Sequence, residues 1–404
     1  MKLFYFGSVC DKEIFNETVN KSKVKPSASA QNFEYALIKG FSENQSVDIT
    51  VASAESIAAF PKGNRLFLKK RRDKLTDRCF TSIIPAVNLP LLKQFGHSRG
   101  AARLLKKWLK ENQDVGDKCV LVYGLYTAVA KKLLKVCRKN NCKIFAVITD
   151  IPATMFTYTN SKNIFKRLFS GAYRKKAIEL QDKFDGYVFL TDAMSDAVAK
   201  DKPYVLVETI ADTEIFNGLE NVEKSSPKAI MYAGALYQKY GLDLILDTFE
   251  KIKSDCELWL FGSGDYEAEI IKRAESNAKI KFFGRVSRDE ILKKEREATL
   301  LINLRNVKDE YTKYSFPSKM VEYMLSATPI VTTKLEGIPD EYDSYSYTTR
   351  EVEPGKIAEY IDSILSKGKE QIRLLGERAK KFIIENKNSA VQTKRIADFL
   401  SEQL

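Results

Sequence analysis

Short apolar runs alternate with longer amphipathic segments along nearly the whole chain. The runs are rich in Val, Ile, Phe and Tyr, as buried strands are, and the segments between them carry apolar residues at helical spacing. This order of elements predicts an α/β fold with parallel sheets. The predicted strands lie at residues 2–6, 46–52, 118–124, 143–149, 186–191 and 204–208, and then at 228–234, 256–262, 280–284, 299–304 and 329–333.

The predicted strands form two successive sets, which indicates two Rossmann-like domains. Strand character gives way to a polar turn in ETIADTEIF, just after the last strand of the first set. The final fifty residues have helical patterns only. We therefore expect an N-terminal domain over 1–206, a linker over 207–227, a C-terminal domain over 228–380 and a last helical segment over 381–404.

Composition narrows the class of protein. The 404 residues are 44% hydrophobic and 29% charged, which is typical of a soluble globular chain, and no apolar run reaches a membrane-spanning length. The N-terminal stretch MKLFYFGSVCD predicts a first strand and not a signal peptide. Six scattered cysteines favour buried free thiols in a reducing cytosol. The single histidine, His97, excludes a His-rich zinc site.

The net charge of +13 is concentrated in the first half of the chain. Residues 61–110 contain fourteen Lys or Arg and two acids, and residues 162–176 contain six cations and no acid. Such a basic, partly aromatic face is compatible with an anionic membrane surface, with nucleic acid or with solubility alone. We expect the membrane surface as partner and no specific nucleic acid.

Several strong catalytic motifs are absent, among them G-x-x-x-x-G-K-[ST], D-x-D and G-x-S-x-G. The remaining candidates follow predicted strands, where open α/β sheets bind ligands. Gly262, Ser263 and Gly264 would let a backbone approach a phosphate, or form a plain strand-to-helix turn. Lys239 would pair with a phosphate or be a solvated loop lysine. Arg285 would contact a base or phosphate or lie free on the surface.

The segment SFPSKMVEYMLSATPIVTT, residues 315–333, is the most informative. Ser318 is a natural N-cap for a helix that begins at Lys319, but Val321 occupies the position where a capping box needs Glu or Gln. Glu322, one residue too late, should lie near the first turn of the helix. There a carboxylate is well placed to accept hydrogen bonds from a sugar diol while nearby amides hold phosphate.

Four segments together resemble one family. YAGAL…KYGLDLIL, LWLFGSGDYE, KFFGRVSRDEIL and, most specifically, SFPSKMVEYMLSATPIV are similar to motifs of the GT-B glycosyltransferases of the group-1 type, also called family four, which are mostly retaining. They occur in order and at compatible spacing. The resemblance covers most of the second half of the chain and is fainter in the first half.

The resemblance implies two Rossmann-like domains facing a central cleft, with the nucleotide-sugar donor on the second, the acceptor on the first, and the C-terminal helix returning to the first. It also implies chemistry without a metal or other cofactor, in which a lysine and a helix dipole stabilise the leaving group. The implied donor site consists of Glu322 at the ribose hydroxyls, Ser318 and Lys319 near the diphosphate, Lys239 at the departing diphosphate, and Gly262–Gly264 with Arg285 along the nucleotide.

The chain departs from the family pattern at three positions. Tyr314 stands eight residues before Glu322, where the family usually has a first glutamate that touches the donor sugar. Ala235 replaces a common arginine, which leaves more of the charge to Lys239. Asp150 ends a first-domain strand that often ends in histidine, and it would orient the acceptor or cap a loop.

We therefore expect a cytoplasmic glycosyltransferase, peripherally associated with the inner face of the membrane, that uses a UDP-sugar to extend a lipid-linked glycan for surface polysaccharide. Two alternatives stay open. One is a GT-B nucleotide-sugar epimerase, and the other is a catalytically idle homologue that stabilises a partner enzyme.

Overall fold

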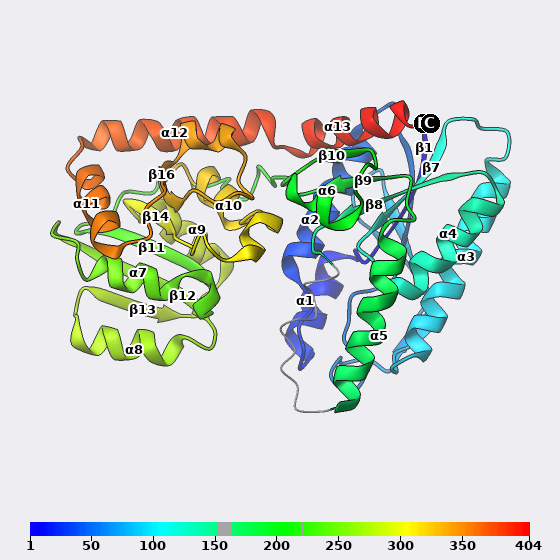
Figure 1. The fold of residues 1–404 in the computed structure, drawn as a ribbon, viewed down its shortest axis with the longest axis horizontal. Coiled ribbons are helices and arrows are strands. Elements are labelled where there is room, and N and C mark those ends of the chain that lie inside the picture. Colours follow the sequence, from blue (N-terminus) through cyan, green and yellow to red (C-terminus); the bar gives the residue numbers. More distant parts are fainter. Residues whose placement is uncertain (152–163, 220) are drawn as a thin grey trace. The chain divides into compact units, whose positions relative to one another are not determined.

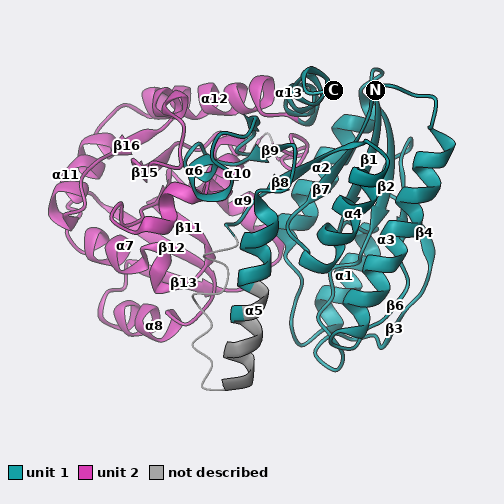
Figure 2. Ribbon diagram, turned by 45° about the vertical axis from the view of Figure 1, so that its right-hand side comes forward, with its two compact units in different colours: residues 1–210, 389–404 teal, residues 211–388 magenta. Residues whose placement is uncertain are grey.

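The structure is a computed structural model that describes residues 1–151, 164–219 and 221–404. Lys162, the first member of the second basic cluster, lies outside these ranges. The chain forms two compact units, residues 1–210 with 389–404 and residues 211–388 (Figure 2). In the described residues, no helix is both long enough and apolar enough to cross a membrane.

The first unit is built on an eight-stranded sheet in the order β10-β9-β8-β7-β1-β2-β5-β4. All neighbours run parallel except β4, which is antiparallel to β5. The strands are β1 (Lys2–Gly7), β2 (Asp48–Ser53), β4 (Arg71–Lys74), β5 (Phe80–Ile83), β7 (Lys118–Tyr123), β8 (Lys143–Ile148), β9 (Gly186–Phe189) and β10 (Tyr204–Leu206). A separate antiparallel pair consists of β3 (Phe67–Leu68) and β6 (Ala86–Val87).

Helices of the first unit flank this sheet (Figure 1). They are α1 (Lys12–Lys21), α2 (Ala28–Glu43), α3 (Leu92–Glu111), α4 (Thr127–Lys139), α5 (Ile164–Gln181), α6 (Ala193–Val198) and α13 (Ser389–Glu402). The C-terminal helix α13 is part of this unit because it packs on α2 and on the sheet. Gly40 of α2 leaves room for Thr393, and the Phe399 ring meets the Phe145 ring edge-on with centroids 5.9 Å apart.

The second unit contains a six-stranded parallel sheet in the order β13-β12-β11-β14-β15-β16. Its strands are β11 (Lys228–Ala235), β12 (Cys256–Ser263), β13 (Ile280–Gly284), β14 (Leu300–Asn303), β15 (Ile330–Thr333) and β16 (Tyr347–Thr349). Its helices are η1 (Gln238–Tyr240), α7 (Leu242–Phe249), α8 (Glu267–Ser276), α9 (Arg288–Glu297), η2 (Glu310–Tyr314), α10 (Lys319–Leu325), η3 (Asp340–Tyr345), α11 (Pro354–Leu365) and α12 (Lys369–Asn386).

Strand residues of the second unit alternate between two buried clusters, one on each face of the sheet. Met231 and Ala233 of β11 belong to the cluster that contains α10 and α12, whereas Ile230 and Tyr232 belong to the cluster with α7 and α11. Both faces are therefore covered, which explains why these strands are continuous apolar runs in the sequence.

The prediction of parallel α/β architecture in two domains is confirmed. Each predicted strand is present, and the helix predicted to begin at Lys319 begins there. The short strands β3, β4, β5, β6 and β16 were not predicted, because two to four residues carry too little periodicity to be recognised. All six cysteines are buried free thiols, as expected.

Candidate functional site: the carboxyl edge of the second sheet

Parallel strands bring their carboxyl ends to one edge of the sheet, and most of the predicted donor-site residues lie there. Ser263 ends β12, Gly284 ends β13 with Arg285 directly after it, and Lys239 follows β11 within η1. Arg305 follows β14, the strand beside β11 on its other side. Four of the residues predicted from the sequence thus lie at or directly after these strand ends, and Arg305, which was not predicted, lies there as well.

Gly262 and Gly264 hold the ends of β11 and β12 in close contact. Gly262 has a φ of 133°, and a Cβ atom there would lie 1.8 Å from the carbonyl oxygen of Gly234. At Gly264 a Cβ atom would lie 2.1 Å from the carbonyl oxygen of Leu236. The Gly264 N–H donates to Glu267 at 2.7 Å. The glycines thus serve backbone packing, and one amide of this turn already has a carboxylate partner.

Two cations flank one aromatic ring beside β11. The Nζ atom of Lys239 lies 5.1 Å from the ring centroid of Tyr240, and the guanidinium carbon of Arg305 lies 5.2 Å from the same centroid. The hydroxyl of Tyr311 donates to the Lys239 carbonyl at 2.5 Å, which ties η1 to η2. Within the described residues, Arg305 Nε is buried without a hydrogen-bond partner. Lys239 and Arg305 thus supply positive charge after β11 and β14, whereas Ala235, at the end of β11, has no charge.

The short helix α10 is fixed to β11 by Tyr323. The Tyr323 hydroxyl accepts from the Ala233 N–H at 2.8 Å and donates to the Ala233 carbonyl at 3.1 Å. Ser318 occupies the N-cap position, but its side chain makes no capping hydrogen bond and is exposed. The expectation of a Ser318 side-chain cap is therefore wrong, and its hydroxyl is left to face solvent.

Glu322 lies in a cluster of charged groups between α9 and α10. Its carboxylate accepts a short hydrogen bond from Lys319, and Arg288 approaches its second oxygen at 3.6 Å. Lys319 also lies 3.7 Å from Glu295 Oε1, which belongs to α9. The Glu295 side chain is fully buried, whereas that of Glu322 keeps 19% of its surface exposed.

Burial and the neighbouring charges separate the pKa values of the two glutamates. Burial, with the charge of Glu322 added, holds the pKa of Glu295 well above its usual range. Burial would also raise the pKa of Glu322, but Lys319 outweighs it and lowers that pKa. For Lys319, burial is likewise outweighed by the two carboxyl groups, so its pKa is raised. The cluster therefore contains an ionised Glu322 and a neutral Glu295.

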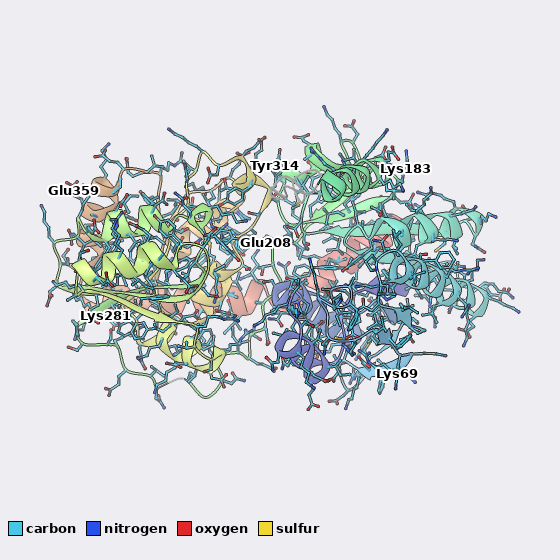
Figure 3. All side chains as sticks on the ribbon, turned by 90° about the horizontal axis from the view of Figure 1, so that it is seen from below. Lys69, Lys183, Glu208, Lys281, Tyr314 and Glu359 are labelled. Carbon is cyan, nitrogen blue, oxygen red and sulfur yellow. The ribbon has the colours of Figure 1, made fainter. Side chains whose placement is uncertain are left out.

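The remaining predicted residues lie apart from this cluster. Tyr314 ends η2 and is half-buried, with Lys313 Nζ 4.9 Å from its ring centroid (Figure 3). Arg285 is exposed. Asp150 belongs to the first unit, where it follows β8 and accepts from the Thr149 hydroxyl at 3.5 Å. The side chain is exposed, yet partial desolvation raises its carboxyl pKa.

A pocket of about 530 Å³ lies at the carboxyl edge of the first sheet. It is bounded by the loop after β2 and the first turns of α3 and α4. Lys93 and His97 of α3 line it, and burial lowers the pKa of His97 to about 4. Among the described residues, His97 Nε2 has no hydrogen-bond partner. Neither Lys93 nor His97 was among the site residues predicted from the sequence.

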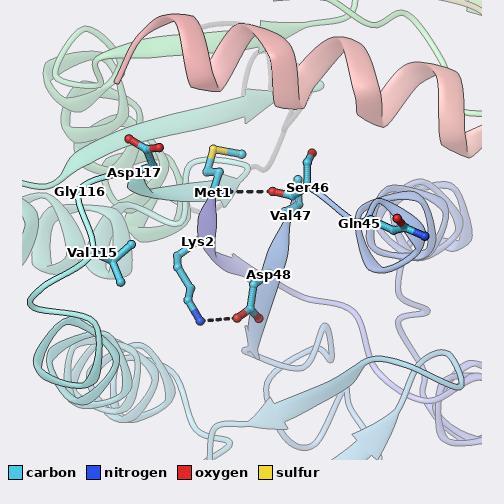
Figure 4. Close-up of a pocket in the computed structure, with 9 residues that line it drawn as sticks. All are labelled: Met1, Lys2, Gln45, Ser46, Val47, Asp48, Val115, Gly116 and Asp117. Atoms are coloured by element: carbon cyan, nitrogen blue, oxygen red, sulfur yellow. Dashed lines mark hydrogen bonds and ion pairs between the residues drawn. The ribbon is translucent and has the colours of Figure 1, made fainter.

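A second hollow of about 460 Å³ lies at the opposite edge of the first sheet, beside the N-terminus (Figure 4). There the terminal ammonium donates to the Ser46 carbonyl at 2.8 Å, and Lys2 pairs with Asp48. Its lining comes from the amino ends of β1 and β2, where open α/β sheets do not bind their ligands. Among the described residues, no group of three or more His, Cys, Asp or Glu side chains forms a ligand set for a metal.

Residues 219–382 match the sequence model of the family described as glycosyl transferases group 1. The matched residues make up most of the second unit, so this unit is similar in sequence to the group 1 glycosyltransferases. This match confirms the resemblance drawn from the four sequence segments. Glu322, Lys239 and Arg305 of the site described above all lie within the matched residues.

Solved structures similar to the whole chain have the two-domain GT-B fold. HepE of Anabaena in complex with UDP is 14% identical, with 100% of each chain covered and a TM-score of 0.62. Sucrose-phosphate synthase from Thermosynechococcus elongatus is 12% identical over 100% of this chain and 99% of its own, with a TM-score of 0.62. The lipopolysaccharide outer core galactosyltransferase WaaB is 12% identical over 100% of each chain, with a TM-score of 0.61. No curated protein sequence matches the chain.

Proposed function

We propose that the protein transfers a sugar from a nucleotide sugar to a hydroxyl group of a glycan acceptor. The observation that carries the proposal is the carboxylate of Glu322, held ionised by Lys319 at the start of α10 in the part of the chain that matches the group 1 glycosyltransferases. An ionised, partly exposed carboxylate accepts two hydrogen bonds from a vicinal diol, and the ribose of the donor supplies such a diol.

The proposed donor is a UDP-sugar. Support comes from structures of Anabaena HepE, which has the same fold and is described in complex with UDP and with UDP-glucose. In this proposal Arg285 and the Gly262–Gly264 turn lie along the nucleotide. The Ser318 hydroxyl, which makes no capping hydrogen bond, binds the diphosphate. Tyr314 replaces a carboxylate beside the donor sugar, so the sugar is held there by a phenol or a ring face.

The leaving diphosphate would be stabilised by Lys239 together with Arg305. Both cations lie about 5 Å from the Tyr240 ring, so one rigid side chain sets their separation. Fixed positive charge near a departing phosphate lowers the barrier without reorganisation, and we propose that no metal ion is required. We also propose that the reaction retains the configuration at the transferred sugar. A donor phosphate oxygen would act as the base that takes the proton of the acceptor hydroxyl.

The proposed acceptor is a lipid-linked glycan bound by the first unit. Support comes from the pocket beside β2 and α4, which combines apolar walls with Lys93 and His97, and from Asp150 with its raised pKa. WaaB, which shares the fold, is described as a lipopolysaccharide outer core galactosyltransferase. We propose a role in surface polysaccharide synthesis at the cytoplasmic face of the membrane, where lipid-linked intermediates are available to a basic protein.

A thermal-shift screen of UDP-, GDP- and ADP-sugars tests the donor site. We expect one class to raise the melting temperature of the wild type and not that of Glu322→Ala, because ribose recognition is lost. Glu322→Gln keeps the shape and should bind about tenfold more weakly, since a charged acceptor becomes neutral. Glu310→Ala, exposed in η2, is the matched control. Equal binding by the wild type and Glu322→Ala would overturn the site.

The idle-homologue alternative is favoured by one specific observation. Lys319 is directed to two carboxyl groups, while Tyr314 and Ala235 replace a family glutamate and arginine. An idle homologue would bind a nucleotide sugar and release no nucleotide in the presence of membrane glycolipids. An epimerase would convert the donor without any acceptor.

A further inference from the structure

Large apolar side chains are exposed together at one end of the first unit. Phe67 keeps 64% of its surface exposed, Leu91 63% and Phe95 56%. Val87 and Leu92 are exposed as well, at 37% and 53%. We call these five residues the apolar face. Isolated exposed apolar residues are common, but a group of this kind marks an interaction surface.

The five residues are neighbours because of how β3, β6 and α3 pack. Phe67 is paired directly opposite Val87, while the adjacent Leu68 is buried, so both exposed side chains stand on the solvent side of this strand pair. Gly96 lets α3 approach β6, because a Cβ atom there would lie 3.2 Å from the Cβ of Ala86. Figure 2 shows β3 and β6 side by side at this end of the first unit.

Leu91 and Leu92 begin α3 in an unusual backbone setting. Leu91 has a φ of 67°, in the left-handed region that bulky residues rarely adopt, and its side chain provides no cap for the helix. The Phe95 N–H donates to the Leu91 carbonyl at 3.0 Å, which places both side chains on adjacent turns of one helix end. The Leu91 backbone is strained, and because its side chain is exposed, no burial within the first unit offsets that strain.

Cations surround the apolar face. Lys69 and Lys70 follow β3 directly and are exposed, and Lys69 stands at the outer margin of the first unit in Figure 3. Arg99 lies over the Phe95 ring, with its guanidinium carbon 4.7 Å from the centroid. The nearby acids are already paired, since Asp73 accepts from Arg71 at 2.8 Å and Asp77 pairs with Lys74 at 2.7 Å.

We propose that the apolar face, with Lys69, Lys70 and Arg99, docks the first unit on an anionic lipid bilayer. Phe67, Leu91 and Phe95 would enter the boundary between headgroups and acyl chains, while the cations stay at the level of the lipid phosphates. The charge complements an anionic leaflet. The inference rests on the membrane location in the proposed function and names the surface that would hold the protein there. Vesicle binding is measured without a donor, so its failure is distinct from a failure of sugar transfer.

Vesicle co-sedimentation without nucleotide sugar tests the docking surface. We expect the full chain to bind vesicles of phosphatidylcholine mixed with phosphatidylglycerol and to bind pure phosphatidylcholine weakly. Lys69→Glu with Lys70→Glu should weaken binding by about fivefold per cation or more. Phe67→Ser with Phe95→Ser should weaken it by about tenfold or more, because apolar burial is lost. These positions are exposed, so both variants should fold.

Two matched variants control for charge and for apolar surface. Lys131→Glu with Lys132→Glu reverses two exposed cations of α4 in the same unit, and Leu374→Ser removes a leucine of α12 that is 47% exposed. Both should bind as the wild type does. If Lys131→Glu with Lys132→Glu weakens vesicle binding as much as Lys69→Glu with Lys70→Glu does, the attraction depends on net charge alone. That result would overturn the docking surface.

Insertion is measured separately by fluorescence quenching. Trp108 and Trp259 are buried, at 4% and 7% exposure, so Phe67→Trp adds the one exposed tryptophan. Brominated lipids should quench Phe67→Trp strongly and Leu374→Trp little. Equal quenching would overturn the proposal. Two other results would also overturn it. One is a dimer of the wild type that dissociates in Phe67→Ser with Phe95→Ser while vesicle binding is unchanged. The other is a ribonucleic acid that binds Lys69 and Lys70 and thereby prevents vesicle binding.

Discussion

Glu295 of α9 and Glu322 of α10 share one cation, because Lys319 Nζ lies 3.7 Å from Glu295 Oε1 and pairs with Glu322 Oε1. Neither oxygen of Glu295 receives a hydrogen bond from a donor in the described residues. Burial and the charge of Glu322 hold the pKa of Glu295 well above its usual range, so Glu295 retains its proton. Glu322 is thereby held between Lys319 and a neutral acid.

Glu295→Gln should change how stability depends on pH. The pKa of Glu295 is raised in the folded state, so its favourable contribution is complete below the unfolded value of about 4.3 and is lost as the pH rises. Glutamine cannot ionise. The melting temperature of the variant relative to the wild type should therefore increase from pH 5 to pH 8. Glu290→Gln, exposed on the same helix, controls for the loss of an acid. A difference that stays flat or falls would contradict a neutral Glu295.

Glu295 also shows where sequence reasoning ends. Its neighbours Lys293, Lys294, Arg296 and Glu297 are charged, so the segment reads as a solvated face. Only the packing of α9 against α10 places one of these carboxyl groups inside. By contrast, Glu322 could be singled out from the sequence because its departure from the capping box is a local feature. Local patterns are visible in sequence, whereas burial of a polar residue depends on contacts distant in the chain.

The strands were predictable for a related reason. Strands covered on both faces are continuous apolar runs, and all of these were recognised. The pair β3–β6 has two residues in each strand and no such run, so the apolar face at Phe67 and Val87 could not be foreseen. Arg305 was missed because a single arginine after a strand resembles any surface arginine until its position over the Tyr240 ring is known.

The shared position of Lys239 and Arg305 over Tyr240 predicts a large catalytic effect. Arg305→Ala should lower turnover of the donor by about 10²-fold, as for the loss of one fixed group that stabilises developing charge. Steady-state kinetics with the donor selected by the thermal-shift screen provides the measurement. Lys308→Ala removes an exposed cation from the same loop and should have little effect. Equal losses in the two variants would argue for general charge and against a positioned arginine.

Two glycines at strand ends should differ sharply in their tolerance of alanine. A Cβ atom at Gly262 would lie 1.8 Å from a backbone oxygen, so Gly262→Ala should destabilise the second unit by about 3 kcal/mol or more. Gly284 has a φ of 64° and no atom within 4 Å of its Cβ position, so Gly284→Ala should cost about 1 kcal/mol of backbone strain. Urea unfolding followed by Trp259 fluorescence measures both. Similar values would contradict the packing role of Gly262.

Glu34 of α2 should make the stability of the first unit depend on pH. Burial raises its pKa to about 7, although hydrogen bonds from Ser8 and Tyr5 oppose the shift. Its stabilising contribution is complete below about pH 4 and is lost as the pH rises through 7, which amounts to roughly 3 kcal/mol. Glu34→Gln should remove this slope. Urea unfolding followed by Trp108 fluorescence between pH 4 and pH 8 tests it, and a slope that persists in the variant would contradict the assignment.

The most direct test of the central claim is transfer of label from a UDP-sugar to membrane glycolipid. We predict that the wild type moves radiolabelled sugar into the lipid-extractable fraction and releases UDP. Lys239→Ala should reduce the rate by about 10²-fold or more while still binding the donor. Glu322→Ala should lose donor binding as well. The contrary result is that the protein binds the UDP-sugar but releases no UDP with any of the membrane glycolipids, so that all label stays in the UDP-sugar. That result would contradict glycosyl transfer and establish the idle homologue.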